Sequence, residues 1–452
     1  MRGTESLSRI AHFAALATPS PDARARAASA FLDTIGVTLA GVPEPASRIV
    51  RTQLGPAPDP GCVVWGTTTR STAPDTALAN GTAAHALDYD DMCFVSLAHP
   101  SAPLVPAVIA TAEVARAPGR AALDAYIVGF EIEARLGRVM NPRHYQRGWH
   151  NTSTLGTIGA AAAASRLLGP SADAAAHAIA IAASEASGLK ENFGSMVKPL
   201  HAGLAARNGV LAARLASAGL TASAQALHGP QGFLHAMDSE RDDLTREMAD
   251  LGERWEILDT GITVKLYPSC AGTHPTLDAL LDLRAREPFT ADDVDRIEID
   301  VDPIVPTILI HDRPASALEA KFSMPFCAAA AIAFGRVGID TFDDERRRDP
   351  RVLSLMPKIA MRVNPDVGKG APALTEARVR VYLKGGRTLA KDAHGARGYS
   401  ARPASDAELD AKFTACATRV LSADRAAGVL AELRRMDQLD DVRVLTSQLA
   451  SD

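Results

Sequence analysis

The chain has 452 residues, of which 47% are hydrophobic and 22% are charged, and its formal net charge is −5 at pH 7. This length allows two or three domains with a large core, and the composition is typical of a soluble globular protein. A weakly acidic chain does not predict the basic surface that nucleic-acid binding needs, so we expect no nucleic-acid partner. We expect no membrane partner either, because the longest apolar stretches are alanine-rich and interrupted by arginine or glutamate.

The five cysteines are spread along the chain without a Cys-x-x-Cys pair. This spacing argues against a zinc ribbon, an iron–sulfur cluster and a disulfide framework, and it favours a reducing compartment. The first residues lack the long apolar segment of a signal peptide. We therefore expect a cytoplasmic protein.

Residues 1–257 are predicted to form an all-helical domain. Pro21 with Ser20 before it is a typical helix start. Further helical patterns occupy residues 103–116, 121–140, 154–168, 173–188 and 199–219. Small residues dominate several of these helices, as in the segment 156–165, and they allow close helix packing inside a bundle or a dimer.

The pattern changes after about residue 258, and residues 258–403 are predicted to form a smaller α+β domain. Apolar and polar side chains alternate, as in half-buried strands, at 296–301, 358–363 and 377–383. Gly385-Gly386, followed by residues 387–391, indicates a hairpin. Helical patterns lie between the strands at 275–286 and 317–334. Residues 404–452 are helical again, and we expect them to pack back on the helical domain.

The most informative segment runs from His85 to Asp91, where one histidine and three aspartates lie within seven residues, and His99 follows beside a proline. The preceding stretch is alanine-rich and helix-forming, and on a helix His85 and Asp88 would share one face. Titratable groups at the end of a helix, where the chain turns, are well placed to meet a ligand. From these residues alone, a metal site, an acid–base site and a capped surface turn all stay open.

Lysines at other turns add to this set. Lys198 precedes Pro199 at a predicted helix start, where a cation is unfavourable for the helix dipole and therefore suggests a function or a compensating anion. Further candidates are His150 before an alanine-rich helix, Lys265, Tyr267 and Cys270 where the second domain begins, and Lys321 near Glu319. The chain has no P-loop and no dinucleotide-binding glycine motif. Lysines neutralise carboxylates and a histidine or aspartate moves a proton at the adjacent carbon, so this set suits an anionic substrate.

Five motifs resemble those of the MmgE/PrpD family, in the family's order and over nearly the whole chain. They are Asn80-Gly-Thr-Ala-Ala-His-Ala-Leu-Asp-Tyr-Asp-Asp91, His99-Pro-Ser101, Lys198-Pro-Leu-His201, Lys265-Leu-Tyr-Pro-Ser-Cys270 and Glu319-Ala-Lys-Phe-Ser-Met-Pro325. Members of the family include 2-methylcitrate dehydratase, cis-aconitate decarboxylase and iminodisuccinate epimerase. The resemblance implies a mainly α fold with a large all-helical domain and a smaller α+β lid domain. It also implies a homodimer and a cofactor-free active site in the cleft between the domains.

Carried over residue by residue, the resemblance implies an active-site aspartate at Asp88 and a proton-transfer histidine at His99. It implies a loop histidine at His150 and substrate-facing lysines at Lys198 and Lys265. We expect a further set of residues to bind the substrate, namely His85, Asp91, His201, Tyr267, Cys270, Lys321 and Phe326. We expect neither a metal ion nor a cofactor.

Three positions depart from the decarboxylase branch of the family. Cys270 stands where that branch is expected to carry a histidine, Phe326 stands in place of a tyrosine, and Met92 in place of a threonine. The segment from Asp88 to His99 is also slightly longer. These departures make decarboxylation less favoured than dehydration or epimerisation.

The sequence therefore predicts a cofactor-independent lyase that dehydrates a small hydroxy-polycarboxylate, similar to 2-methylcitrate dehydratase. Lys198 and Lys265 would neutralise carboxylates of this di- or tricarboxylate substrate. His99 or His150 would move the proton at the α carbon, and Asp88 would orient a histidine or assist the leaving hydroxide.

Three other functions stay open. An epimerase of a dicarboxylate such as iminodisuccinate would use the same proton abstraction without a leaving group. A metal-dependent hydrolase would be built on His85, Asp88, Asp90 and Asp91, although no further cluster completes its coordination sphere. A non-catalytic protein would bind carboxylates without proton exchange.

Overall fold

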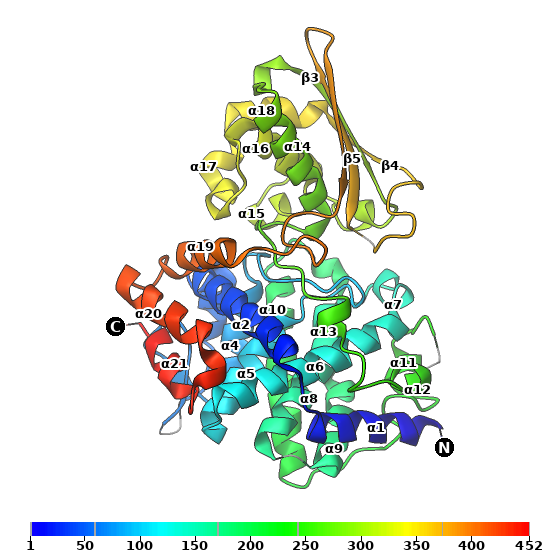
Figure 1. Ribbon diagram of the computed structural model, residues 1–452, viewed down its shortest axis with the longest axis vertical. Coiled ribbons are helices and arrows are strands. Elements are labelled where there is room, and N and C mark those ends of the chain that lie inside the picture. Colours follow the sequence, from blue (N-terminus) through cyan, green and yellow to red (C-terminus); the bar gives the residue numbers. More distant parts are fainter. Residues whose placement is uncertain (1, 58–59, 170, 242–243, 373, 452) are drawn as a thin grey trace.

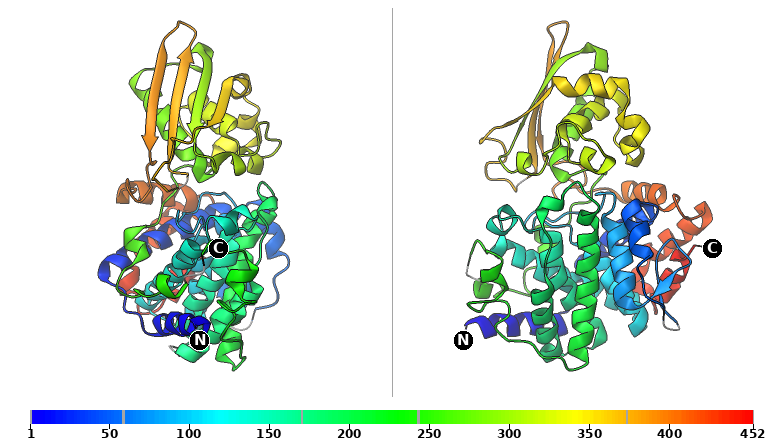
Figure 2. Two further views of the ribbon diagram at one scale, coloured as in Figure 1. Left: turned by 90° about the vertical axis from the view of Figure 1, so that its right-hand side faces the viewer. Right: turned by 180° about the vertical axis from the view of Figure 1, so that it is seen from behind.

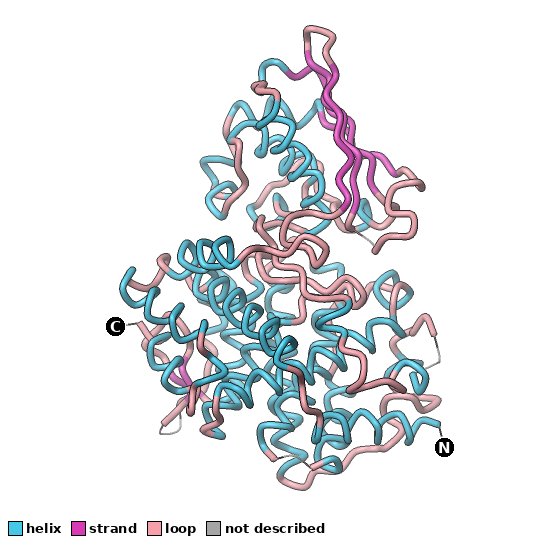
Figure 3. Tube along the Cα trace, viewed as in Figure 1, coloured by secondary structure: helices cyan, strands magenta, loops and turns pink. Residues whose placement is uncertain are grey.

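The computed structural model describes residues 2–57, 60–169, 171–241, 244–372 and 374–451. The chain forms a large helical body and a smaller α+β part that lies above it in Figure 1. The prediction of a mainly helical fold with a smaller α+β domain is thus confirmed. Loops gather where the two parts meet (Figure 3). Within the described residues, no helix is long and apolar enough to cross a membrane.

The helical body contains most of the helices, together with one short strand pair. Its helices are α1 (Arg2–Leu16), α2 (Pro21–Gly41), α3 (Pro45–Arg51), α4 (Ala73–His85), α5 (Ser101–Ala115), α6 (Gly119–Met140), α7 (Arg143–Gln146), α8 (Asn151–Leu168), α9 (Ala172–Glu185), α10 (Val197–Ser217), α11 (Phe233–Ala236), α12 (Leu244–Glu247) and α13 (Glu256–Asp259). The strands are β1 (Cys62–Val63) and β2 (Arg70–Ser71). Helix α2 begins as predicted, since the Ser20 hydroxyl accepts a hydrogen bond from the Ala23 amide and Pro21 lies in the first turn.

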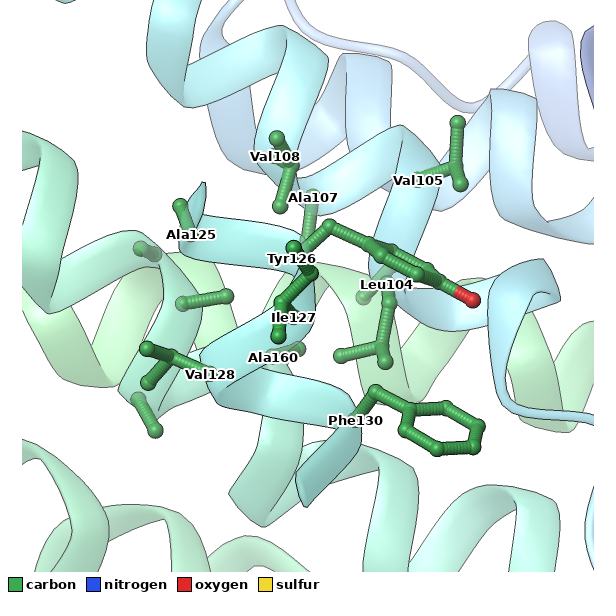
Figure 4. Packing of buried hydrophobic residues seen from close by; sticks show 14 of the residues in the cluster. Leu104, Val105, Ala107, Val108, Ala125, Tyr126, Ile127, Val128, Phe130 and Ala160 are labelled. Atoms are coloured by element: carbon green, nitrogen blue, oxygen red, sulfur yellow. The ribbon is translucent and has the colours of Figure 1, made fainter. Parts of the chain in front are cut away.

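Large and small side chains have different places in the helical body. Branched and aromatic residues of α5 and α6, such as Val108, Tyr126 and Phe130, fill the core (Figure 4). Small residues let α10 lie directly against α4 and α8, and a Cβ added to Gly81 would come within 2.9 Å of the Gly203 Cα. The small-residue faces are therefore used inside the bundle, and the homodimer stays a prediction.

The α+β part is built on one four-stranded sheet. Its strands are β3 (Val294–Val301), β4 (Ile359–Val363), β5 (Glu376–Leu383) and β6 (Thr388–His394). They lie in the order β4-β3-β5-β6, with β4 parallel to β3 and the other pairs antiparallel. The helices are α14 (His274–Arg286), α15 (Ala317–Ala320), α16 (Met324–Phe334), α17 (Asp344–Arg347) and α18 (Pro350–Leu355). They cover one face of the sheet (Figure 2), because alternate residues of β5 are buried on that side.

The predicted helix over 317–334 is interrupted at Lys321. The Ser323 hydroxyl accepts a hydrogen bond from the Phe326 amide, and Pro325 lies in the first turn of α16. Proline lacks an amide hydrogen and clashes with the preceding turn, so the helix restarts here instead of continuing from α15. The break leaves Lys321 free to reach across to the helical body.

The last helices of the chain are α19 (Asp406–Ala417), α20 (Ala423–Arg434) and α21 (Arg443–Leu449). They lie against the helical body beside α2 (Figure 1). Buried Lys412 of α19 places its Nζ 2.6 Å from Asp33 Oδ1 of α2 and donates hydrogen bonds to the carbonyls of Tyr89 and Lys265. The carboxyl-terminal helices are thereby fastened to the backbone beside the loops at the junction.

Replacement of Lys412 by Met should destabilise the protein, because Asp33 would lose its buried counter-ion and two carbonyls would lose their donor. Removing one partner of a buried ion pair costs about 3–5 kcal/mol. Urea unfolding would measure this loss in the free energy of unfolding. The double variant Lys412→Met/Asp33→Asn should recover part of it, and an equal loss in both variants would contradict the role given to the ion pair.

Candidate active site

The loop between α4 and α5 carries Asp88 in a strained conformation. Its φ is 52°, in the left-handed region, which costs a non-glycine residue about 1–2 kcal/mol. Three consecutive carbonyls of this loop each accept a hydrogen bond from a different buried ammonium group. The donors are Lys321 for Leu87 (2.6 Å), Lys265 for Asp88 (2.9 Å) and Lys412 for Tyr89 (2.8 Å). The three lysines hold the turn in the shape that presents Asp88.

The Asp88 carboxylate lies between two lysines. Lys198 Nζ lies 2.6 Å from Oδ1, and Lys265 Nζ lies 3.0 Å from Oδ2. Burial opposes the ionisation of Asp88, but the two ammonium groups outweigh it and hold the pKa of Asp88 well below its ordinary value. Asp88 is thus a permanent anion at neutral pH. It is the compensating anion that Lys198 requires in the first turn of α10.

Asp90 fixes the protonation of His85. Its carboxylate accepts a hydrogen bond from His85 Nδ1 at 2.7 Å, so the proton lies on Nδ1 and the lone pair on Nε2. Lys198 Nζ donates to that Nε2 at 2.8 Å. Burial is the largest cause that lowers the pKa of His85, to about 3, and the ring is therefore neutral. His85 orients the lysine and has no nitrogen left for a substrate.

The His99 ring also lies next to the Asp90 carboxylate, but unlike the His85 ring it lines the cavity. Its Nδ1 lies 3.2 Å from Asp90 Oδ2, and its Nε2 lies 4.0 Å from Asp88 Oδ1. Its backbone amide donates to the Thr152 hydroxyl of α8 at 3.0 Å, which holds the loop in place. Burial lowers the pKa of His99 below its ordinary value. A neutral ring that carries its proton on Nδ1, next to the Asp90 carboxylate, would present the Nε2 lone pair, as a general base requires.

His150 is buried; it caps a helix and its side chain lines the cavity. Its carbonyl begins α8 by accepting hydrogen bonds from the amides of Ser153 and Thr154, so the residue is the N-cap. Its Nδ1 lies 3.0 Å from His201 Nδ1, which requires one ring to donate and the other to accept. Burial lowers the pKa of both histidines, in His201 to about 4. The pair is therefore neutral, and His150 is a second candidate for proton transfer.

These groups meet at a small cavity between the helical body and the α+β part. It is lined by Asp88, Met92, Leu97, His99, Tyr145, His150, Phe193, Lys198, Cys270, Ala271, Ile308, Phe322 and Leu374. Its volume is about 20 Å³, which is room for one water molecule. Ligand pockets usually measure about 300–1,000 Å³, so substrate entry requires this closed site to open.

Four of the five predicted catalytic residues line the cavity, whereas Lys265 and several predicted substrate-binding residues lie outside its lining. Lys265 is fully buried behind Asp88, and His85 and His201 lie behind Lys198 and His150. Cys270 does line the cavity, and burial raises the pKa of its thiol to about 11, so it is present as the neutral thiol.

Four other predicted substrate contacts have different partners, because hydrogen bonds or packing direct their side chains elsewhere. Asp91 binds Ser101, Tyr267 donates to Asp278, Lys321 binds the carbonyls of Leu87 and Pro268, and Phe326 packs on Phe342 at a ring distance of 5.6 Å. Phe326 lines a separate groove of about 910 Å³ on the α+β part. These four residues support the site or the fold around it without entering the cavity.

Sequence reasoning left several lining residues out. Tyr145 and Phe193 are isolated aromatic residues that resemble ordinary core positions in the sequence, and Phe322 lies in the motif 319–325, from which only Lys321 was predicted to bind the substrate. Asp90 had a signal, its place in the aspartate cluster, but the sequence did not show that it supports two histidines.

His85, Asp88, Asp90 and His99 bring their ligand atoms within 4.8 Å of one another, as metal ligands would. Lys198, however, donates to two of these groups, and Lys265 to Asp88. The ammonium groups supply the positive charge that the carboxylates need, and the donor set is used for proton placement. The geometry therefore fits acid–base chemistry better than metal binding.

Two family models together match most of the chain. The MmgE/PrpD N-terminal domain matches residues 5–244, and the MmgE/PrpD C-terminal domain matches residues 267–438. The chain belongs to the MmgE/PrpD family. The predicted resemblance is thereby confirmed.

Named members of the MmgE/PrpD family are similar over most of their length. Cis-aconitate decarboxylase of Homo sapiens is 30% identical over 401 residues, which cover 85% of this chain and 81% of the relative. The enzyme of the same name from Mus musculus is 30% identical and covers 85% and 80%. A cis-aconitate decarboxylase-like protein of Aspergillus oryzae is 28% identical and covers 95% and 94%.

Replacement of Asp91 by Asn should make the protein less sensitive to high pH. Burial raises the pKa of Asp91 to about 8, although its hydrogen bonds with Ser101 oppose the shift. Between about pH 4 and pH 8 the folded protein keeps a proton on Asp91 that the unfolded chain releases, so stability falls as pH rises through this window.

In the Asp91→Asn variant, the loss of folding stability with rising pH, on the order of a few kcal/mol, should disappear. Denaturant unfolding of both proteins at pH 5 and pH 8 would measure it. If the difference between the two proteins in the free energy of unfolding does not grow from pH 5 to pH 8, the raised pKa of Asp91 is contradicted.

Proposed function

We propose that this protein is a cofactor-independent lyase that moves a proton at the carbon next to a substrate carboxylate. The observation that carries the proposal is the convergence of neutral His99, cationic Lys198 and ionised Asp88 on one closed cavity. Such a site offers a base for the proton, a cation for the carboxylate and a low-dielectric environment that strengthens both interactions.

Lys198 is suited to bind the carboxylate. Its ammonium has three N–H groups, of which Asp88 and His85 take two, and the third is left for the substrate. A carboxylate held there accepts electron density from the adjacent carbon when the proton leaves. The carbanion character of the transition state is then stabilised where it develops.

His99 is the proposed base, with Asp90 behind it. When Nε2 takes the proton, the ring becomes a cation, and the Asp90 carboxylate beside Nδ1 stabilises that charge. In a dehydration, the C–H electron pair forms the C=C bond, the C–O bond breaks, and the leaving hydroxide departs as water with the proton that His99 has taken, which returns His99 to its neutral form. We propose this reaction on a hydroxycarboxylate of the 2-methylcitrate type.

Decarboxylation is the second candidate, because the similar proteins of human and mouse are named cis-aconitate decarboxylase. That reaction would break a C–C bond and use a histidine to protonate the product carbon. Met92 and Cys270, which replace polar residues expected in that branch, both line the cavity. This apolar substitution at the reacting surface favours dehydration. Epimerisation of a dicarboxylate would use His99 and His150 on opposite faces of one carbon.

Proton NMR in heavy water tests the proposal with the purified full chain and citrate, 2-methylcitrate, cis-aconitate and iminodisuccinate. Deuterium at an α position together with loss of water would identify a dehydratase, and release of CO₂ a decarboxylase. Exchange with inversion and no elimination would identify an epimerase. Binding of a carboxylate without any exchange would contradict proton transfer as the function.

The variant Lys198→Met should lower kcat/KM by at least about 100-fold, since a single electrostatic donor at a developing charge is worth this much. Lys384→Met is the matched control, because Lys384 is exposed at the turn between β5 and β6 and should leave turnover unchanged. Circular dichroism would establish that both variants are folded. Full turnover by a folded Lys198→Met protein would reject the assigned role.

Exhaustive treatment with a chelator should leave turnover unchanged, because Lys198 and Lys265 already bind the Asp88 carboxylate, which a metal ion would need as a ligand. Turnover before and after treatment, with addition of Zn²⁺, Mn²⁺ or Mg²⁺ afterwards, is the measurement. Loss on chelation and recovery with one ion would instead establish a metal-dependent enzyme on His85, Asp88, Asp90 and His99.

A further inference from the structure

One side chain marks where the closed cavity comes nearest to solvent. Of the described residues that line the cavity, Phe193 alone is half-buried, and the others are buried. The Phe193 ring lies 4.9 Å from the His150 ring and 5.8 Å from the Phe322 ring, and Lys198 Nζ lies 5.4 Å from its centroid. Phe193 therefore stands between the catalytic groups and water, and we expect a substrate to enter at this side chain.

Phe193 shares a short turn with a lysine. The 3₁₀ turn η1 (Lys190–Asn192) precedes Phe193, whose amide donates to the Lys190 carbonyl at 2.9 Å. The turn lies between Gly188 and Gly194, whose φ values of 125° and 86° are ones that other residues rarely adopt. A ligand that displaces the Phe193 ring would therefore also meet the segment that carries Lys190.

The Lys190 ammonium group has no counter-ion. It is half-buried, and its Nζ donates to the Tyr145 carbonyl at 3.2 Å and lies 4.1 Å from the centroid of the Tyr145 ring. No carboxylate among the described residues forms an ion pair with it. Burial lowers the pKa of Lys190, and no neighbouring charge opposes this shift. A partly desolvated cation without an anion is unfavourable, and a carboxylate of a ligand would relieve it.

Tyr145 connects Lys190 to the cavity. The side chain is buried and belongs to the cavity lining, so one aromatic residue touches both the lysine and the ligand space. Lys198 is the one ammonium group in the described lining of the closed cavity, and Asp88 already binds it. A substrate with several carboxylates therefore needs a further cation once the site opens, and Lys190 lies beside the entrance.

We infer that Lys190 binds a second carboxylate of the substrate, away from the carboxylate that Lys198 holds. This carboxylate would take the place of the Tyr145 carbonyl as the partner of the ammonium group. The inference rests on the proposed function for the carboxylate at Lys198. It makes Lys190 the residue that selects polycarboxylates over acids with a single carboxylate.

Citrate binding by variants of Lys190 tests this inference. Isothermal titration calorimetry with the full chain gives the Kd of citrate for the wild type, Lys190→Met and Lys190→Arg. We expect the Met variant to bind citrate at least about tenfold more weakly, the low end of what a hydrogen bond between charged groups contributes. The Arg variant keeps a cation at this position and should recover most of the loss. Citrate binding by Lys190→Met that equals that of the wild type would overturn the inference.

A matched ligand and a matched variant show whether the loss is specific. 2-Hydroxy-2-methylbutanoate has a single carboxylate for the position at Lys198, so its Kd should be the same in the wild type and in Lys190→Met. An equal loss for this ligand and for citrate would overturn the inference. Lys358→Met should leave both Kd values unchanged, because Lys358 is also half-buried and donates to a backbone carbonyl, that of Val294 at 2.7 Å, but lies on the α+β part. Thermal unfolding would establish that the variants are folded.

The Lys198→Met variant separates this inference from the proposed function. Weaker citrate binding by Lys198→Met, with wild-type binding by Lys190→Met, would retain the proposed function and overturn the second contact. Weaker citrate binding by Lys190→Met, with wild-type binding by Lys198→Met, would retain Lys190 as a carboxylate-binding residue and reject the position proposed at Lys198.

Discussion

The ion cluster on Asp88 is the interaction on which the rest of the site depends. A carboxylate buried in a protein is normally driven towards its neutral form, and here two ammonium groups reverse that tendency. The same lysines are held by Asp88, so each charge makes the burial of the other possible. The strained turn that presents Asp88 exists because three ammonium groups bind its carbonyls from outside.

The cluster also joins the parts of the molecule. Lys198 comes from the helical body, Lys265 from the chain that enters the α+β part, Lys321 from the α+β part itself, and Lys412 from the carboxyl-terminal helices. A closed cavity therefore forms only when all three are packed together. Closure of the cavity therefore strengthens the attraction between Asp88 and its lysines. Separation of the parts would expose these charges to water, which screens them.

The proposed proton transfer rests on the charged residues of the cavity, and apolar residues make up much of the remaining lining. The Asp90 carboxylate lies next to both His85 and His99. The His85 ring accepts a hydrogen bond from Lys198, and the His99 ring lines the cavity. Apolar side chains such as Phe193 and Phe322 surround the Lys198 ammonium group.

The sequence by itself determined the fold class and the family, because helix periodicity, strand alternation and short polar motifs are local signals. It also predicted catalytic roles for Asp88, His99, His150 and Lys198, and the structure brings these four residues to one cavity. It also anticipated that Lys198 needs a compensating anion. It did not determine which residues stand behind the cavity, since Tyr267, Lys321 and Phe326 lie in motifs yet point elsewhere. Tertiary structure alone decided that Asp90 lies next to two histidines and that Leu97 and Leu374, both with a positive φ, line the cavity. Both depend on contacts between segments far apart in the chain, which no local pattern records.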